Sequence, residues 1–220
     1  MNKIEDYFYN NTKRVIHKWT GYFEIYERYF NTYVNKNINI LEIGVQNGGS
    51  AQMWRDYFGD GCKIYGIDIN DQCKSIESDW LKIYIGNQSD RNFLNLIKGE
   101  CPKFDIIIDD GGHISHDIIV SFEELFPHLK YGGVYLCEDL HANYFESHGG
   151  LRGADNTFTN YLRKMLDEYH LYSCDPQMSN SYIKNIMGIY FHESVVVIEK
   201  CYDRKKSESI ITGNDMIIKI

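Results

Sequence analysis

The sequence predicts a doubly wound α/β fold, in which helices cover both faces of a mostly parallel sheet. Short β-branched runs alternate with amphipathic helical patterns along the chain. The run at 38–45 leads into the glycines of 44–49 and then into a helical pattern, which is how such a sheet begins. The runs at 186–191 and 194–198 are separated by only two residues, which indicates an antiparallel hairpin near the end of the chain.

Each predicted element follows from its hydrophobic pattern. The predicted strands are short and rich in β-branched residues, and they lie at 38–45, 62–68, 81–86, 104–109, 131–137, 186–191 and 194–198. The predicted helices have apolar residues three or four positions apart, and they lie at 21–34, from 51 onward, and at 93–97, 115–126 and 157–169. We expect the helix at 21–34 to lie over one edge of the sheet. Asp90 is placed to cap the helix at 93–97, and Pro127 ends the helix at 115–126.

Length and composition predict one structural domain. The chain has 220 residues, of which 43% are hydrophobic, and this is enough for a sizeable core. Within the domain we expect an N-terminal helical cap at 1–37, a core at 38–201 and a C-terminal extension at 202–220. The apolar residues 216–220 at the end of the extension form a candidate edge strand.

Charge and cysteine usage exclude several classes of partner. The net charge of −8 argues against nucleic acid as a main partner, because phosphate binding requires a basic face. Neither a signal peptide nor an apolar run of the ~20 residues that cross a bilayer is present, so we expect no membrane partner. The six cysteines are scattered without a Cys-x-x-Cys pair, which is typical of a reducing compartment. We therefore expect a cytoplasmic protein.

The glycine-rich turn after the first strand indicates a ligand site. Three residues separate Gly44 from Gly48, so the Gly-x-Gly-x-x-Gly pattern of dinucleotide sites is absent. Glu42 would repel a phosphate and attract an amine, which suits S-adenosylmethionine; a plain strand-to-helix turn explains the turn equally well. Asp68 lies 24 residues after Gly44, where a doubly wound fold places the carboxylate that binds ribose hydroxyls. Asp68 is also an ordinary turn residue, but its spacing favours ribose.

Acidic residues follow two neighbouring predicted strands. Asp109 and Asp110 end one strand and Glu138 and Asp139 follow the next, with His113 and His141 close behind. The carboxyl ends of parallel strands meet at one edge of a sheet, so we expect these side chains to converge there. Like charges at one place repel each other, and a hard cation such as Mg²⁺, Mn²⁺ or Ca²⁺ relieves the repulsion. Helix capping or pairing with Lys or Arg is the alternative, and we expect it to explain one of the four acids.

Several motifs in this order resemble those of class I S-adenosylmethionine-dependent methyltransferases. They are Leu-Glu-Ile-Gly-Val-Gln-Asn-Gly-Gly-Ser at 41–50, Gly-Ile-Asp at 66–68, Gly-Asn-Gln-Ser-Asp at 86–90, Ile-Ile-Asp-Asp-Gly-Gly-His at 107–113 and Glu-Asp-Leu-His at 138–141. Over residues ~15–200 the chain is most similar to the metal-dependent branch that contains macrolide-sugar O-methyltransferases and cephalosporin-hydroxylase-like proteins. The resemblance implies a single-domain, Rossmann-like sheet of seven strands whose last strand is antiparallel.

The resemblance also implies a set of site residues. S-adenosylmethionine would have its methionine part near Glu42 and Gly44, its ribose on Asp68 and its adenine near 88–90. The full set of expected cofactor contacts is Glu42, Gly44, Asn47, Gly48, Ser50, Asp68, Gln88, Ser89, Asp90, Asp109 and Tyr22. Asp110, Glu138 and Asp139 would hold Mg²⁺ (or Mn²⁺), with Asp110 and His113 as catalytic residues and His113 as the general base. Members of the family often have Ser in place of Gly112 and His near Gly21, so the cofactor contacts of the N-terminal segment are the least defined.

The implied activity is O-methylation of a hydroxyl on a sugar or a glycosylated small molecule. Two alternatives keep the fold: a catechol-like or phosphorylated acceptor, and a binding protein that retains S-adenosylmethionine without catalysis. A NAD-dependent oxidoreductase is disfavoured by the missing Gly-x-Gly. We expect the acceptor pocket to be built from loops 142–156 and 175–185, with 173–181 as a candidate lid. A homo-oligomer through the aromatic helix at 21–34 is a further expectation.

Overall fold

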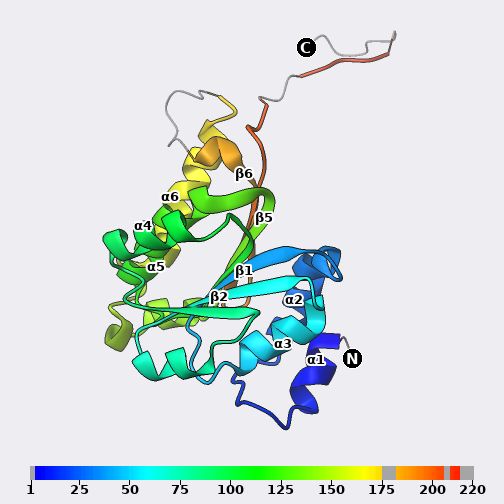
Figure 1. Ribbon diagram of the computed structural model, residues 1–220. Helices are drawn as coiled ribbons and strands as arrows, with labels where there is room; N and C mark the ends of the chain where they lie inside the picture. The colour runs from blue at the N-terminus through cyan, green and yellow to red at the C-terminus, as the bar shows by residue number, and fades with distance from the viewer. Residues whose placement is uncertain (1–2, 175–181, 206–208, 214–220) are drawn as a thin grey trace.

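The structure is a computed structural model that describes residues 3–174, 182–205 and 209–213. Its strands form one seven-stranded sheet in the order β3-β2-β1-β4-β5-β7-β6 (Figure 1). The strands are β1 (Ile38–Ile43), β2 (Cys62–Asp68), β3 (Leu81–Ile85), β4 (Phe104–Asp109), β5 (Leu129–Cys137), β6 (Ile186–His192) and β7 (Val195–Lys200). The α-helices are α1 (Lys3–Tyr9), α2 (Tyr22–Phe30), α3 (Gly49–Phe58), α4 (Arg91–Glu100), α5 (Ser115–Leu125) and α6 (Phe158–Leu171).

Strand direction confirms the predicted doubly wound sheet. β1, β2, β3, β4 and β5 pair in parallel, whereas β7 pairs antiparallel with both β5 and β6. The seven strands and the antiparallel last strand are therefore as predicted. Strand order reverses between β1 and β4, and ligands of open α/β sheets bind outside the strand ends at such a switch point. β4 and β5 are neighbouring strands, so the residues that follow them lie side by side at the carboxyl edge of the sheet. There the Glu138 amide donates to the Asp109 carbonyl (3.0 Å).

Helices cover the two faces of the sheet, and each face has its own apolar cluster. One cluster joins α1, α2 and α3 to residues such as Ile106 and Ile108 of β4, and the other joins α4, α5 and α6 to Ile107 of the same strand. This alternation follows from successive side chains of a strand pointing to opposite faces. Helix α2 packs on one of these faces and reaches the edge strand β6, where the hydroxyl of Tyr29 lies 3.0 Å from Nε2 of His192. This agrees with the expectation that the helix lies over one edge of the sheet.

The aromatic residues of α2 face the core because its apolar positions recur at helical spacing. Tyr22, Phe23, Tyr26 and Phe30 are all buried, so these four residues belong to the core, and an oligomer interface through this helix stays a prediction. Its aromatic character serves packing against Trp54 of α3, whose ring centroid lies 5.0 Å from that of Tyr26.

Most predicted element boundaries agree with the structure to within a few residues. Helix α5 ends at Leu125 and is followed by a 3-10 turn (Phe126–His128) that contains Pro127. Helix α1 was not predicted. The division of the chain at residues 37 and 201 stays a prediction, and 216–220 and most of the candidate lid at 173–181 lie outside the described residues.

Helix hydropathy and the state of the cysteines complete the description of the fold. Among the described residues, no helix combines the length and the apolar character that a membrane span requires. All six cysteines are free thiols, and four of them are buried.

Asp90 caps helix α4 as predicted, and its removal should weaken the fold. Its Oδ1 accepts from the amides of Asn92 (2.9 Å) and Phe93 (3.3 Å). We expect Asp90→Ala to lower the free energy of unfolding by about 1 kcal/mol and Asp90→Ser to restore most of it, because serine also caps helices well. Urea denaturation measures both. Asp167→Ala, an exposed substitution in α6, serves as the control, and an equal loss in the control would contradict the capping role.

Candidate active site

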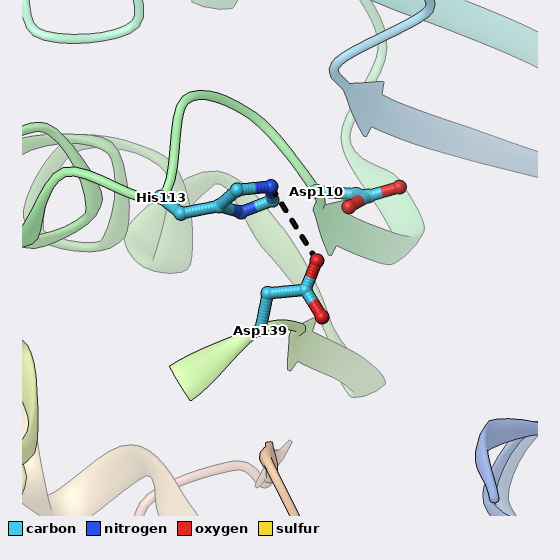
Figure 2. A group of neighbouring side chains, drawn as sticks. All are labelled: Asp110, His113 and Asp139. Atoms are coloured by element: carbon cyan, nitrogen blue, oxygen red, sulfur yellow. Dashed lines mark ion pairs between the residues drawn. The ribbon is translucent and has the colours of Figure 1, made fainter. Parts of the chain in front are cut away.

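Three polar side chains meet at the adjacent ends of β4 and β5. Asp110 follows β4 directly, His113 follows it by one short turn, and Asp139 lies two residues beyond β5 (Figure 2). Ligand atoms of the three residues all lie within 4.8 Å of one another, and Nε2 of His113 is 3.4 Å from Oδ2 of Asp139. The predicted convergence of these residues is therefore present in the structure.

Two of these residues have left-handed backbone conformations. His113 has φ = +55° and Asp139 has φ = +56°, which is uncommon for residues with a Cβ. Such conformations persist where surrounding structure fixes them, and they gather at functional sites. Here they turn the two side chains toward Asp110 at the point where each strand ends.

Lys18 neutralises part of the negative charge. Its Nζ donates to Oδ2 of Asp110 (2.5 Å) and to Oε2 of Glu138 (2.7 Å), and its side chain is only 2% exposed. Burial lowers the pKa of Lys18, but the charges of Glu138 and Asp110 raise it by more, so Lys18 is held as the cation. Pairing with lysine thus involves two of the four acids, not the one that we expected.

Glu138 points into the protein. Its second oxygen, Oε1, accepts from the hydroxyl of Tyr26 (2.6 Å), and the residue is 1% exposed. Burial raises the pKa of Glu138 and the Lys18 ammonium opposes that rise. In this arrangement both carboxylate oxygens of Glu138 already have partners within the protein, so Glu138 stands apart from the group formed by Asp110, His113 and Asp139.

Asp109 also lies apart from that group, which corrects the expectation that four acids share one edge. As the last residue of β4 it follows Ile107 to the opposite face of the sheet. There its carboxylate accepts from Ser121 Oγ (2.6 Å), Tyr135 OH (2.9 Å) and Gln88 Nε2 (3.1 Å). Burial raises the pKa of Asp109, and these hydrogen bonds oppose the rise.

A hydrogen-bond network fixes Asp139 and His141 beside the group. The hydroxyl of Tyr22 donates to Oδ1 of Asp139 (2.6 Å), and Nδ1 of His141 lies 2.6 Å from Oγ of Ser194. Tyr22 comes from α2 and Ser194 from the turn between β6 and β7. The N-terminal helix and the C-terminal hairpin therefore both support the site.

Glu42 is a buried acid with one unpartnered oxygen. Its Oε1 accepts from Nε1 of Trp54 (2.8 Å), whereas Oε2 is buried without a hydrogen-bond partner among the described residues. Burial raises the pKa of Glu42 to about 7 against an ordinary 4.5, with Lys18 and Trp54 opposing the rise. A buried oxygen without a partner fits a missing donor such as the ammonium of S-adenosylmethionine.

The glycine turn beside Glu42 is tightly built and covered. Gly44 has φ = +89° and a Cβ there would clash with the carbonyl oxygen of Asp110. Asp68 fixes the turn, because its Oδ2 accepts from the amides of Val45 (2.9 Å) and Gln46 (2.8 Å). Residues 15–18 lie across the turn and leave a cavity of about 10 Å³, which is room for one water molecule. A cofactor at this turn therefore requires residues 15–18 to move.

The remaining expected cofactor contacts are found at the ends of β1 and β3. Gln88 is buried, and its Oε1 accepts from the Gly112 amide (3.1 Å), which ties the ends of β3 and β4 together. The hydroxyl of Ser89 donates to Asn87 (2.8 Å), Asn47 is exposed, and Gly48 and Ser50 are buried in the turn. Their contact with a cofactor stays a prediction, as does that of Asp68, Asp90, Asp109 and Tyr22.

A larger cavity of about 640 Å³ opens next to the group. Its walls come from the start of α2, from the 3-10 turn after Asp139 and from the β6–β7 hairpin. The aromatic and polar side chains that line it include Trp19, Tyr22, Arg28, His141, Tyr144, Phe191 and His192. Among the described residues of the two predicted acceptor loops, Tyr144 lines the cavity, and most of the loop at 175–185 lies outside the described residues. The hairpin and α2 were not expected there.

The donor set of the site fits a hard divalent cation. The carboxylate oxygens of Asp110 and Asp139 suit Mg²⁺ or Mn²⁺. Asp110, His113 and Asp139 already lie close enough to share one ion.

Sequence reasoning missed Lys18, Tyr26 and Trp54 as partners of the acids, and it missed Ser194 as the partner of His141. Lys18 and Asp110 are 92 residues apart, and Lys18 and Glu138 are 120 apart, so no local pattern connects them. One feature of the sequence could have indicated this role: Lys18 lies just before the strongly aromatic helix α2. A carboxylate buried among aromatic side chains requires a cation nearby.

Fold and sequence similarity together define the class. No protein-family model matches the chain. Its sheet order and its similarity to solved methyltransferases show that the chain has the fold of the class I S-adenosylmethionine-dependent methyltransferases. This confirms the resemblance seen in the motifs.

Individual relatives narrow the comparison to O-methyltransferases. The chain is 35% identical over 188 residues to mycinamicin VI 2''-O-methyltransferase of Micromonospora griseorubida, covering 80% of this chain and 47% of that protein. It is 32% identical to demethylmacrocin O-methyltransferase of Streptomyces fradiae over the same shares. The solved MycE methyltransferase in complex with Mg and SAH superposes with a TM-score of 0.81 at 30% identity, covering 97% of this chain and 56% of that one. The chain thus spans about half the length of the curated relatives it matches.

The titration of Glu42 predicts how stability depends on pH. Between pH 4.5 and about 7 the folded state keeps a proton that the unfolded state has lost, so Glu42 makes stability fall as pH rises through this window. Glu42→Gln cannot titrate. We expect the variant to gain on the order of 3 kcal/mol relative to the parent between pH 4.5 and 8 in the ligand-free protein, measured by urea denaturation.

The exposed Glu24 provides the matched control. Glu24→Gln should leave the pH dependence of unfolding as it is in the parent. If Glu42→Gln and the parent differ by the same free energy at both ends of the pH range, Glu42 is not the group that we describe.

Proposed function

We propose that the protein is an O-methyltransferase that uses S-adenosylmethionine and a divalent cation, Mg²⁺ or Mn²⁺, to methylate a hydroxyl of a sugar or glycosylated small molecule. The observation that carries the proposal is the meeting of Asp110, His113 and Asp139 at the ends of β4 and β5, beside a cavity large enough for a small molecule. The unpartnered oxygen of Glu42 supports the cofactor. The similarity to sugar O-methyltransferases supports the acceptor class.

Asp110, Glu138 and Asp139 are the proposed ligands of the cation. Asp110 and Asp139 are already in place, whereas Glu138 must exchange its present partners for the ion. When bound, the cation supplies a Lewis acid that lowers the pKa of the acceptor hydroxyl, and S-adenosylmethionine supplies the methyl group.

The side chains around the ion orient the acceptor and remove its proton. The imidazole of His113 accepts the hydroxyl proton. It can do so because it lies next to Asp110 and Asp139, where the acceptor hydroxyl would bind. Tyr22 holds Asp139 in position through its hydroxyl. Methyl transfer requires the acceptor oxygen, the methyl carbon and the sulfur to lie in line, so a rigid wall that orients the acceptor contributes strongly to the rate.

The cavity of about 640 Å³ is the proposed acceptor site. Trp19, Tyr144 and Phe191 give it aromatic walls, and Arg28 and His192 give it hydrogen-bond donors. Aromatic faces beside polar groups suit a sugar, which has apolar C–H faces and hydroxyl edges. We place the protein in the cytoplasm on the basis of its free thiols, and we keep a homo-oligomer as a prediction without assigning its interface.

Loss of the base or of a cation ligand should abolish methyl transfer. We expect His113→Ala and Asp110→Asn each to reduce the rate about 100-fold or more, measured as S-adenosylhomocysteine formed with Mg²⁺ in excess. Mycinamicin VI, demethylmacrocin and nucleotide-linked sugars are the acceptors to screen. A chelator should stop the reaction of the parent protein.

The exposed His116, on the first turn of α5, is the control for the histidine. His116→Ala should retain the parent rate. A near-normal rate for His113→Ala would remove His113 as the base, and full activity in chelator would remove the cation from the reaction.

The aromatic wall predicts a selective effect on the acceptor. Phe191 is 51% exposed in the ligand-free protein and lines the cavity, so an acceptor would bury its ring. We expect Phe191→Ala to raise the KM for the acceptor about tenfold and to leave the affinity for S-adenosylhomocysteine unchanged. Met187→Ala, on the same strand but outside the cavity, should change neither. Equal KM values for the two variants would place the acceptor elsewhere.

A further inference from the structure

Lys18 occupies an unusual position for a lysine. It is the only buried residue between Asn11 and Thr20, a segment without helix or strand; we call residues 11–20 the covering segment. Its ammonium connects the covering segment to Asp110 after β4 and to Glu138 after β5. One side chain thus bridges the two strand ends at which the proposed cation binds.

The ammonium and the cation need the same oxygen atoms. Lys18 holds Oδ2 of Asp110 and Oε2 of Glu138, and the other oxygen of Glu138 is held by Tyr26. A Mg²⁺ ion binds carboxylate oxygens at about 2.0–2.1 Å. An ammonium within hydrogen-bonding distance of the same oxygen would lie close to the ion, and the two positive charges would repel each other strongly.

We propose that Lys18 is a tethered cation, which holds the Asp110 and Glu138 carboxylates in the metal-free protein and is displaced when a divalent cation binds. The proposal rests on the proposed function, because it takes the cation site from there. It adds that the metal-free site is charge-compensated by the protein itself, so that the buried Glu138 carboxylate and the partly buried Asp110 carboxylate are not left without a cation between them.

Displacement of Lys18 would also release the covering segment. The other described contacts between this segment and the glycine turn are mainly packing contacts. Arg14, Val15 and Ile16 pack against Gly48 and Gly49, and the amide of Arg14 lies 3.4 Å from Oε1 of Gln52. The covering segment closes the space beside Glu42 that the cofactor needs. Binding of the cation at the acids would therefore loosen the cover over the cofactor site.

Mn²⁺ binding to the ligand-free protein tests the competition. We expect Lys18→Met, which keeps the length of the side chain and removes its charge, to bind Mn²⁺ about tenfold more tightly than the parent, measured by titration calorimetry or by the resonance signal of free Mn²⁺. Lys130→Met is the matched control, because Lys130 pairs with Asp105 away from the site (2.8 Å). It should bind Mn²⁺ like the parent. Unchanged or weaker binding by Lys18→Met overturns the proposal.

The same titration separates this proposal from the proposed function. If the parent binds Mn²⁺ and Lys18→Met binds it no better, the cation site stands and the role of Lys18 is wrong. If neither protein binds Mn²⁺, the cation site and the role of Lys18 both fail.

Thermal unfolding tests the proposal even if the Lys18→Met variant is unstable without metal. We expect Lys18→Met to melt at a lower temperature than the parent in chelator and to gain more from Mn²⁺. The double variant Lys18→Met/Glu138→Gln removes one charge of each sign and should recover stability in chelator. If the double variant is as unstable as Lys18→Met, charge compensation is not what Lys18 provides.

Hydrogen exchange distinguishes two outcomes: either the bound cation displaces Lys18, or it binds beside Lys18 while Lys18 stays in place. In the parent, saturating Mn²⁺ should speed amide exchange in peptides that cover residues 11–20. In Lys18→Met these amides should already exchange fast, and Mn²⁺ should have little further effect. If exchange in the parent does not change with Mn²⁺, Lys18 stays in place and the proposal is overturned.

Discussion

Negative charge at the ends of β4 and β5 is the constraint on which the rest of the site depends. The two strands are parallel neighbours in the sheet, so the residues that directly follow them must lie close together. Asp110 and Glu138 are poorly hydrated there, and buried carboxylates require a cation close by. Lys18 supplies one positive charge from the distant N-terminus. Asp139 and His113 complete, with Asp110, a group whose ligand atoms lie within 4.8 Å of one another, which makes the place suitable for a divalent ion.

The sheet and the position of the site were predictable because both follow from short-range patterns. β-branched runs predict strands, and acids directly after two buried strands predict an acidic edge. The alternation of side chains along a strand also determines the position of Asp109, which differs from the convergence that we expected. As the last residue of β4 it must face the same side as Ile107, so it joins Ser121 and Tyr135 on the other face of the sheet. Asp110 is the first residue free of that alternation.

Contacts made by irregular segments were not predictable from the sequence. The buried face of helix α2 can be predicted because its apolar residues recur at helical spacing. The covering segment has no such hydrophobic periodicity, so the sequence does not indicate which residues it contacts. Lys18 alone in that segment is buried, and its partners are known only once the sheet brings Asp110 and Glu138 together. The same holds for Ser194, a turn residue whose contact with His141 depends on the register of the β6–β7 hairpin. Long-range electrostatic partners follow from topology, and topology follows from the regular elements.

Lys18 connects the two halves of the site, and this has a thermodynamic consequence. Its ammonium lies among the acids, while residues 15–17 directly before it cover the glycine turn. A ligand that moves the covering segment must also draw Lys18 away from Asp110 and Glu138, which leaves two carboxylates in need of a cation. An ion that displaces Lys18 in turn loosens the cover. Coupling between two binding sites is reciprocal, so cation and cofactor would each raise the affinity for the other without any direct contact between them.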